Sequence, residues 1–151
     1  MRRTTIPILA LALITACAPR EDAAPDTAAT GVSLADFAGT WDGTVTPPGS
    51  DSVVANIEML ATSTPDGWSF TVVNAANPAM SSTSPARVVA LEGDSLILEA
   101  GPFESILRAG QQVSTRSVYR LQGGTMVGVV RATYAATGDT IMLSSEATRR
   151  R

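Results

Sequence analysis

The residue types that most enzymes use for covalent or metal chemistry are scarce in this chain of 151 residues. Its 11 basic side chains are all arginines, and it has no histidine, no lysine and a single cysteine. Ser-His-Asp and Cys-His catalysis, Schiff-base chemistry, and zinc sites built on histidine or paired cysteines all need residues that are absent. The sequence therefore predicts a protein that is not an enzyme, with no cofactor and no metal site.

Carboxylates are the remaining catalytic groups, and Glu99 and Glu104 lie near each other in the chain. Glycoside hydrolysis needs only two suitably spaced carboxyl groups. Arginines follow in the same region: Arg108 is four residues after Glu104, and Arg116 and Arg120 share a strand face. Acids beside arginines on a sheet surface usually form solvated ion pairs, so we expect cross-strand pairs here. The functional alternative is a surface site for an anionic headgroup or glycan.

The single cysteine, Cys17, ends an N-terminal apolar segment. Arg2 and Arg3 precede an apolar run over residues 6–16, eleven residues long. A membrane-spanning helix needs about 20 apolar residues, so this run is too short to span a bilayer. A short basic region followed by such a run is typical of a secretory signal peptide.

Residues 13–17, Leu-Ile-Thr-Ala-Cys, resemble the bacterial lipobox. The resemblance implies that residues 1–16 are removed as a signal peptide and that Cys17 carries a diacylglyceryl group, with acyl chains such as palmitate. The protein would then be a lipoprotein of the bacterial cell envelope, held to the membrane by its lipid anchor. Ala18 replaces the acidic residue often linked with inner-membrane retention, which favours the outer membrane. The alternative is an ordinary signal peptide cut near Ala16 or Ala18, which gives Cys17 no role.

The segment after Cys17 has the composition of a linker. Residues 18–31 contain two prolines, four charged residues and no large apolar side chain, so they cannot bury enough surface to fold. We expect residues 17–32 to be a lipidated cysteine with a disordered linker, and residues 33–149 to form one β-barrel domain. The net charge of −3, without a basic stripe, argues against nucleic acid as a partner.

Beyond residue 33 the hydrophobic period becomes two, which is typical of strands with one buried face. Short turns such as Asp66-Gly67 and Gly123-Gly124 separate successive stretches. The pattern predicts an all-β fold: a single antiparallel meander of about eight strands. An open sheet of that size would expose two edges and an apolar face, so we expect closure as a small barrel, or else a sandwich. The expected strands cover residues 37–46, 53–61, 68–72, 87–91, 95–100, 112–122, 125–134 and 140–148.

Several segments lack the strand pattern. Residues 74–85 are the longest of these, which predicts a functional or mobile loop. Residues 33–38 or 104–109 have the composition of one helical turn. The three arginines at 149–151 are expected to be a frayed basic tail.

Gly39 and Trp41 open the first expected strand. The sequence Phe-Ala-Gly-Thr-Trp at 37–41 resembles the Gly-x-Trp motif of lipocalins and other calycins. This resemblance implies a small calycin-like barrel in which Trp41 plugs one end and a late basic residue, Arg149 or Arg131, packs over it. It also implies that the barrel binds a hydrophobic or amphipathic small molecule, such as a lipid. Bacterial metalloprotease inhibitors are small eight-stranded barrels with a similar start, and their resemblance implies a protein-interaction module instead.

The expected inward face mixes large side chains with small or hydroxyl ones. Eight strands enclose a space that side chains can fill or that can hold one small ligand. Small inward residues could line a pocket, or they could let strongly coiled strands approach each other. Two functions therefore stay open: a ligand-binding barrel, and a filled barrel acting as a periplasmic inhibitor or envelope-assembly accessory. The candidate residues of a ligand or surface site are Trp68, Arg116 and Glu99.

Overall fold

The computed structural model of the chain describes residues 31–151. Cys17, the expected signal peptide and nearly all of the expected linker lie outside the described residues. Within the described part, no helix is long and apolar enough to cross a membrane.

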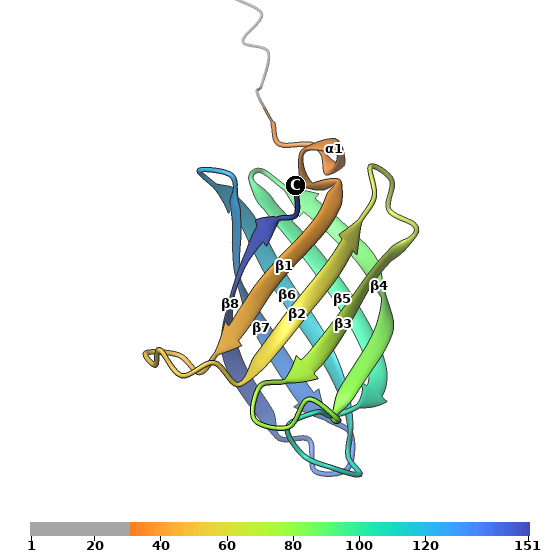
Figure 1. Ribbon diagram of the computed structural model, residues 1–151. Coiled ribbons are helices and arrows are strands. Elements are labelled where there is room, and N and C mark those ends of the chain that lie inside the picture. The colour runs from red at the N-terminus through yellow and green to blue at the C-terminus, as the bar shows by residue number, and fades with distance from the viewer. Residues whose placement is uncertain (1–30) are drawn as a thin grey trace, which may run out of the picture.

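Eight antiparallel strands form one closed barrel in which neighbours in sequence pair and the last strand pairs with the first (Figure 1). This confirms the all-β meander and its closure as a barrel. A one-turn helix, α1 (Leu34–Phe37), precedes the first strand. The strands are β1 (Gly39–Thr46), β2 (Ala55–Ala61), β3 (Trp68–Asn74), β4 (Ser81–Glu92), β5 (Ser95–Glu104), β6 (Gln112–Gln122), β7 (Thr125–Tyr134) and β8 (Thr140–Arg149).

Alternation of side chains decides which face of each strand forms the core. In β2 every second residue, from Ala55 to Ala61, is buried, and the residues between them are exposed. Successive strand side chains point to opposite faces, so a closed barrel places one set in the lumen and the other in solvent. The large side chains that the pattern predicts to point inward, such as Trp41, Met59 and Leu96, are buried.

We call the end of the barrel at α1 the upper end and the opposite end the lower end, as they stand in Figure 1. The main core cluster fills the upper half. Smaller apolar clusters around Ile57 and around Tyr134 lie towards the lower end. The largest buried members of the upper cluster are Phe37, Trp41, Trp68, Leu96, Tyr119 and Met126.

β4 and β5 extend furthest beyond the ranges that their sequence pattern predicts. The expected loop over residues 74–85 is wrong in its second half, because β4 begins at Ser81. Ser82 and Ser84 take the inward positions opposite Val72 and Phe70, and such small polar side chains carry no hydrophobic signal. β5 likewise continues past residue 100 to Glu104. Of the two segments predicted as alternatives for one helical turn, residues 33–38 contain α1, whereas residues 104–109 hold no helix.

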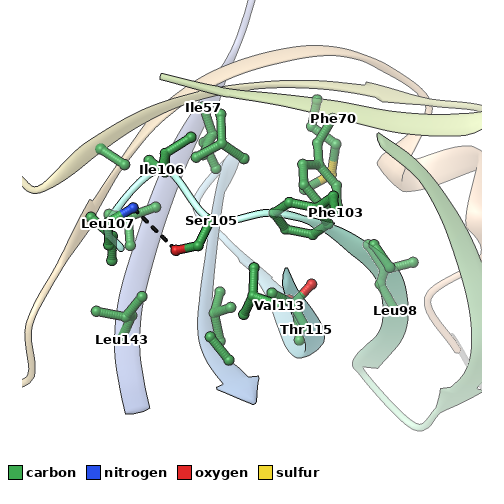
Figure 2. Close-up of a pocket in the computed structure, with 18 of the residues that line it drawn as sticks. Ile57, Phe70, Leu98, Phe103, Ser105, Ile106, Leu107, Val113, Thr115 and Leu143 are labelled. Atoms are coloured by element: carbon green, nitrogen blue, oxygen red, sulfur yellow. Dashed lines mark hydrogen bonds between the residues drawn. The ribbon is translucent and has the colours of Figure 1, made fainter. Parts of the chain in front are cut away.

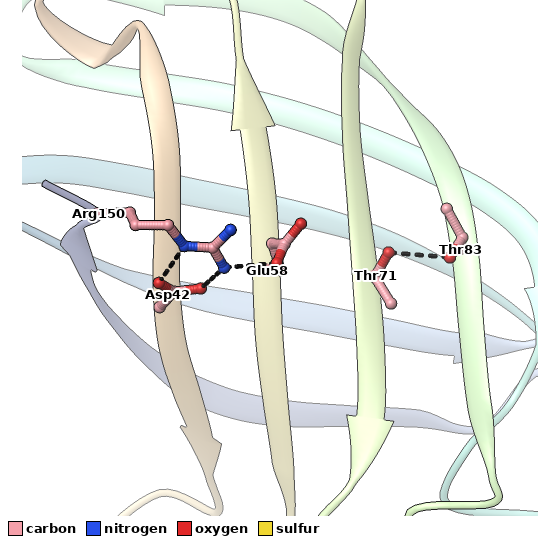
Figure 3. Close-up of polar contacts among 5 residues, drawn as sticks. All are labelled: Asp42, Glu58, Thr71, Thr83 and Arg150. Carbon is pink, nitrogen blue, oxygen red and sulfur yellow. Dashed lines mark hydrogen bonds and ion pairs between the residues drawn. The ribbon is translucent and has the colours of Figure 1, made fainter.

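The C-terminal arginines lie where the last strand, β8, pairs with the first strand, β1. The backbone N–H of Arg150 donates to the carbonyl of Thr40 at 2.8 Å. Its guanidinium bridges Asp42 on β1 and Glu58 on β2 (Figure 3), and these hydrogen bonds raise the pKa of Arg150. The predicted fraying is therefore wrong for Arg149 and Arg150. Packing at the other terminus begins at Val32, one residue before the predicted domain start.

Gly43 allows β1 to approach β8 closely. A Cβ atom at this position would lie 2.3 Å from the carbonyl oxygen of Glu146 and 2.6 Å from the Cβ of Ala147. Both are atoms of a packed strand, so they cannot move aside without shifting the wall. We expect Gly43→Ala to lower the free energy of unfolding by about 1–3 kcal/mol.

A urea titration of Gly43→Ala against the parent checks this expectation. Gly49→Ala is the control, because Gly49 has a φ of 72° but nothing within 4 Å of an added Cβ. It isolates backbone strain, which costs about 1 kcal/mol or less at an exposed turn. A smaller loss in the free energy of unfolding for Gly43→Ala than for Gly49→Ala would contradict the close approach of β1 to β8.

Candidate ligand cavity

Trp41 closes the upper end of the barrel. Its side chain is fully buried, and its indole Nε1 donates to the carbonyl of Phe37 at 2.7 Å. Of the two arginines considered from sequence, Arg149 lies over the ring, with its Cζ 4.6 Å from the ring centroid. The same guanidinium donates to the carbonyls of Asp36 and Ala38 on either side of Phe37. Strand β8 is thereby tied to α1, and the upper end is filled by side chains.

Gly39, the other residue of the predicted motif, lies under this arginine. Its φ is 135°, a backbone conformation that side chains disfavour. A Cβ added there would meet the Arg149 side chain at 3.5 Å. The glycine lets the chain turn from α1 into β1 beneath the guanidinium.

Trp68, a candidate ligand residue from sequence, belongs to the same upper cluster. Its side chain is 1% exposed, and its Nε1 donates to the carbonyl of Thr64 at 2.7 Å. It is absent from the lining of the cavity described next. The structure therefore separates Trp68 from the other two candidates, Glu99 and Arg116.

The lower half of the lumen contains a cavity of about 90 Å³. Its walls are almost entirely apolar and come from all eight strands except β4, as well as from the β5–β6 connection. Figure 2 shows Phe70, Phe103 and Leu98 turned towards it. The barrel is thus filled above and hollow below. The main apolar lining residues are Val45, Ala55, Ile57, Met59, Phe70, Val72, Leu98, Phe103, Ile106, Leu107, Val113, Val130, Ala132 and Leu143.

A small polar strip runs down one wall of the cavity. Tyr119 is buried, and its hydroxyl lies 3.5 Å from the Ser145 hydroxyl. Burial raises the pKa of Tyr119, so the phenol is neutral at pH 7 and can donate a hydrogen bond. Thr115 and Ser117 continue the strip along β6. A ligand in the cavity would meet apolar walls and a few hydroxyl groups.

The β5–β6 connection, residues 105–111, is the floor of the cavity. Ile106 and Leu107 line the cavity, and the Ser105 hydroxyl accepts the backbone N–H of Leu107 at 3.2 Å (Figure 2). The Asn74 amide donates to the carbonyl of Ile106 at 2.7 Å. These hydrogen bonds hold the apolar side chains across the lower end.

Arg108 fastens the floor to the β7–β8 end of the barrel. Its guanidinium pairs with Asp139 at 3.0 Å, and its Cζ lies 4.1 Å from the centroid of the Tyr134 ring. The sequence spacing predicts an ion pair between Arg108 and Glu104, four residues apart, but no such ion pair exists among the described residues. The loop reverses direction after Ser105, and this carries Arg108 towards β7 and β8.

Glu99 and Arg116, the remaining two candidates, lie together on the outer wall. One carboxylate oxygen of Glu99 is 2.5 Å from Arg116 Nη1, and the other is 2.5 Å from Arg87 Nη2. These hydrogen bonds, that from Arg116 first, lower the pKa of Glu99. The cross-strand ion pairs expected from sequence are present, and they link β4, β5 and β6. Both carboxylate oxygens of Glu99 are therefore bound by arginines.

The outer wall beside this cluster is hollowed. An open depression of about 520 Å³ lies over β4 to β7, lined by Arg87, Glu99, Arg116 and Arg131 together with small side chains. Glu99, Ala100 and Thr115 border both this depression and the inner cavity. We call it the outer hollow. Only one layer of strand separates the two spaces at this point.

The titratable groups of the barrel predict how its stability depends on pH. Hydrogen bonds from Arg150, Arg116 and Arg108 lower the pKa of Asp42, Glu99 and Asp139 respectively. Carboxyl groups with a lowered pKa stabilise the fold above their unfolded values, 3.8 for Asp and 4.5 for Glu, and this contribution is lost as pH falls.

The other limb of the profile is set by Tyr119, whose pKa is raised, so its contribution is lost as pH rises above 10. Without histidine or lysine, little else titrates in between. We expect a melting temperature that is flat from about pH 5 to about pH 9 and falls outside that range. Thermal melts across this range check it, and a clear step near pH 6–7 would contradict it.

Sequence reasoning missed the floor of the cavity and the outer hollow. Phe103, Ile106 and Leu107 follow the last residue of the predicted strand 95–100, although three large apolar residues there are a usable signal. In the described part of the chain, no group of three or more His, Cys, Asp or Glu side chains is placed to hold a metal ion. No protein-family model, curated protein or solved structure matches this chain.

Proposed function

We propose that this protein is a lipid-anchored protein of the bacterial cell envelope, with the outer membrane favoured, whose calycin-like barrel binds one small apolar group in its lower lumen. The observation that carries the binding function is the apolar cavity of about 90 Å³ beneath a filled upper half. The anchoring rests on the lipobox resemblance at Cys17. The apolar lining of the cavity and the two arginines bound to Glu99 support binding rather than catalysis.

The size of the cavity selects the shape of its ligand. An engineered apolar cavity of about 150 Å³ accepts benzene, so a space of about 90 Å³ suits a narrower group. The end of an unbranched alkyl chain fits this description. Dry apolar walls favour such a group because its transfer from water gains about 0.8 kcal/mol per buried CH₂.

Binding of n-octanol tests the proposal by calorimetry at several temperatures. We expect saturable binding of one molecule per chain with a negative heat-capacity change, the mark of apolar burial. Ala132→Leu adds a larger side chain to the cavity wall and should abolish binding, whereas Thr71→Ala on the outer wall should not. Non-saturable uptake, or equal binding by Ala132→Leu, would refute a lumenal site.

The second candidate function is a protein-interaction module, such as a periplasmic inhibitor or an envelope-assembly accessory. The filled upper half of the barrel favours it, because a rigid plugged scaffold needs no ligand. This function requires no alkyl-chain binding. A folded protein that binds no octanol would therefore favour it over the first.

A further inference from the structure

The outer hollow concentrates positive charge on a protein that is acidic overall. Three arginines, Arg87, Arg116 and Arg131, border it with one carboxylate, Glu99, which leaves a local charge of +2. The net charge of the whole chain is −3. Among the described residues Arg131 forms no ion pair, whereas Arg87 and Arg116 share Glu99.

The strand register places two of these arginines directly opposite each other. Arg116 on β6 and Arg131 on β7 are cross-strand partners, and both side chains point outwards. Like charges in this arrangement destabilise a sheet. Stability alone therefore gives no reason for this pair, whereas an anion bound between the two guanidinium groups would stabilise it.

The barrel wall beside the hollow is incompletely hydrogen-bonded. Pairing of β4 with β5 ends at Ala86 and Ala100, although both strands continue. Below that point β4 pairs only with β3, and β5 pairs only with β6. We call this unpaired stretch the seam. It lies beside the residues that line both the inner cavity and the outer hollow.

Gly101 explains why β5 leaves β4. A Cβ on Gly101 would lie 2.7 Å from the carbonyl oxygen of Val113 and 2.9 Å from the Cα of Ser114, so β5 lies directly on β6 here. On the other side of the seam, Pro85 has no N–H to offer a neighbouring strand. The inward side chains at this level, Ala86 and Ala100, are small, so little material separates the lumen from the arginines.

We propose that the outer hollow binds the anionic headgroup, a phosphate or carboxylate, of an amphipathic ligand whose alkyl chain passes the seam into the lumen. This inference rests on the proposed lumenal binding function and names its ligand class. Guanidinium groups bind phosphate and carboxylate through paired, charge-assisted hydrogen bonds. The three residues that border both spaces, Glu99, Ala100 and Thr115, mark where the ligand would cross the wall.

The test compares amphipaths that share a chain and differ in headgroup. The full chain carrying Cys17→Ser, so that no lipid is attached, is titrated with n-octyl phosphate, octanoate and n-octanol. We expect the two anions to bind more tightly than octanol, and added salt to weaken the anions only. The stronger of the two anions identifies the headgroup as phosphate or carboxylate.

Charge-removing variants locate the headgroup. Arg116→Gln with Arg131→Gln should weaken octyl phosphate by at least about tenfold and leave octanol within about twofold. Arg120→Gln is the matched control, because Arg120 lies on the same strand and face but pairs with Asp94, outside the hollow. Equal affinity for octanol and both anions, or an equal loss in Arg120→Gln, would overturn the headgroup site.

Failure of the lumenal site gives a different pattern. If octanol does not bind, methyl phosphate tests the hollow without a chain. Binding of methyl phosphate that is lost in the Arg116→Gln and Arg131→Gln variant would keep an anion site and reject the alkyl-chain site. Absence of binding by every probe to the folded protein would reject both.

Discussion

Trp41→Ala should destabilise the barrel more than any other single substitution considered for its described residues. The side chain is fully buried, receives the Arg149 guanidinium on its ring, and donates a hydrogen bond to Phe37. Truncating a buried tryptophan to alanine costs about 3–5 kcal/mol. Typical domains have only about 5–15 kcal/mol of stability, so this is a large share.

Thermal and urea unfolding measure this effect. For a domain of this size about 1 kcal/mol corresponds to roughly 4 °C, so the melting temperature should fall by more than 10 °C. Trp41→Phe should lose less stability, because a phenyl ring keeps part of the packing while the indole N–H is lost. Thr71→Ala, which removes only an exposed hydroxyl contact to Thr83, is the control. A Trp41→Ala protein that melts with the parent would show that the upper plug is not structural.

Cys17→Ser should abolish lipid attachment completely. The lipobox resemblance makes the Cys17 sulfur the acceptor of the diacylglyceryl group, and a serine hydroxyl does not replace it. Two or three acyl chains anchor a protein stably because each buried CH₂ adds about 0.8 kcal/mol. Without these chains, the protein is expected to lose its lipid anchor.

Labelling with radioactive palmitate in the bacterial host measures the anchor. The parent and the control Thr15→Ser should incorporate label, whereas Cys17→Ser should incorporate none and remain as an uncleaved precursor. An ordinary signal peptide predicts the opposite, a silent Cys17→Ser variant that is cut and released. Equal label in both proteins would refute lipid attachment at Cys17.

The barrel could be predicted from sequence because its main signal is local. Alternating apolar residues and short glycine turns specify strands and hairpins, as residues 55–61 and the turn at 123–124 show. The Gly-x-Trp resemblance located Trp41, and an arginine over it was expected from the same resemblance. Contacts between residues far apart in sequence, such as those of Arg149 with α1 and the residue after it, form because the barrel closes.

The seam could not be predicted because it depends on register and backbone geometry. Ser82 and Ser84 take inward positions on β4, although serine carries no hydrophobic signal in the sequence. Gly101 lets β5 approach β6 closely, and no hydrophobic periodicity in the sequence indicates this. The pair of Arg116 and Arg131 becomes visible only once β6 and β7 are placed in register. The structure, and not the sequence, therefore shows that the upper half of the lumen is filled and that the lower half holds a cavity.

Non-denaturing mass spectrometry of the intact protein, purified from the cells that produce it, tests the central claim most directly. We expect one bound molecule per chain with an unbranched alkyl chain, retained by the parent and by Arg120→Gln and lost from Ala132→Leu. A parent protein that keeps no such molecule, or an Ala132→Leu variant that keeps it equally, would contradict a ligand in the lower lumen.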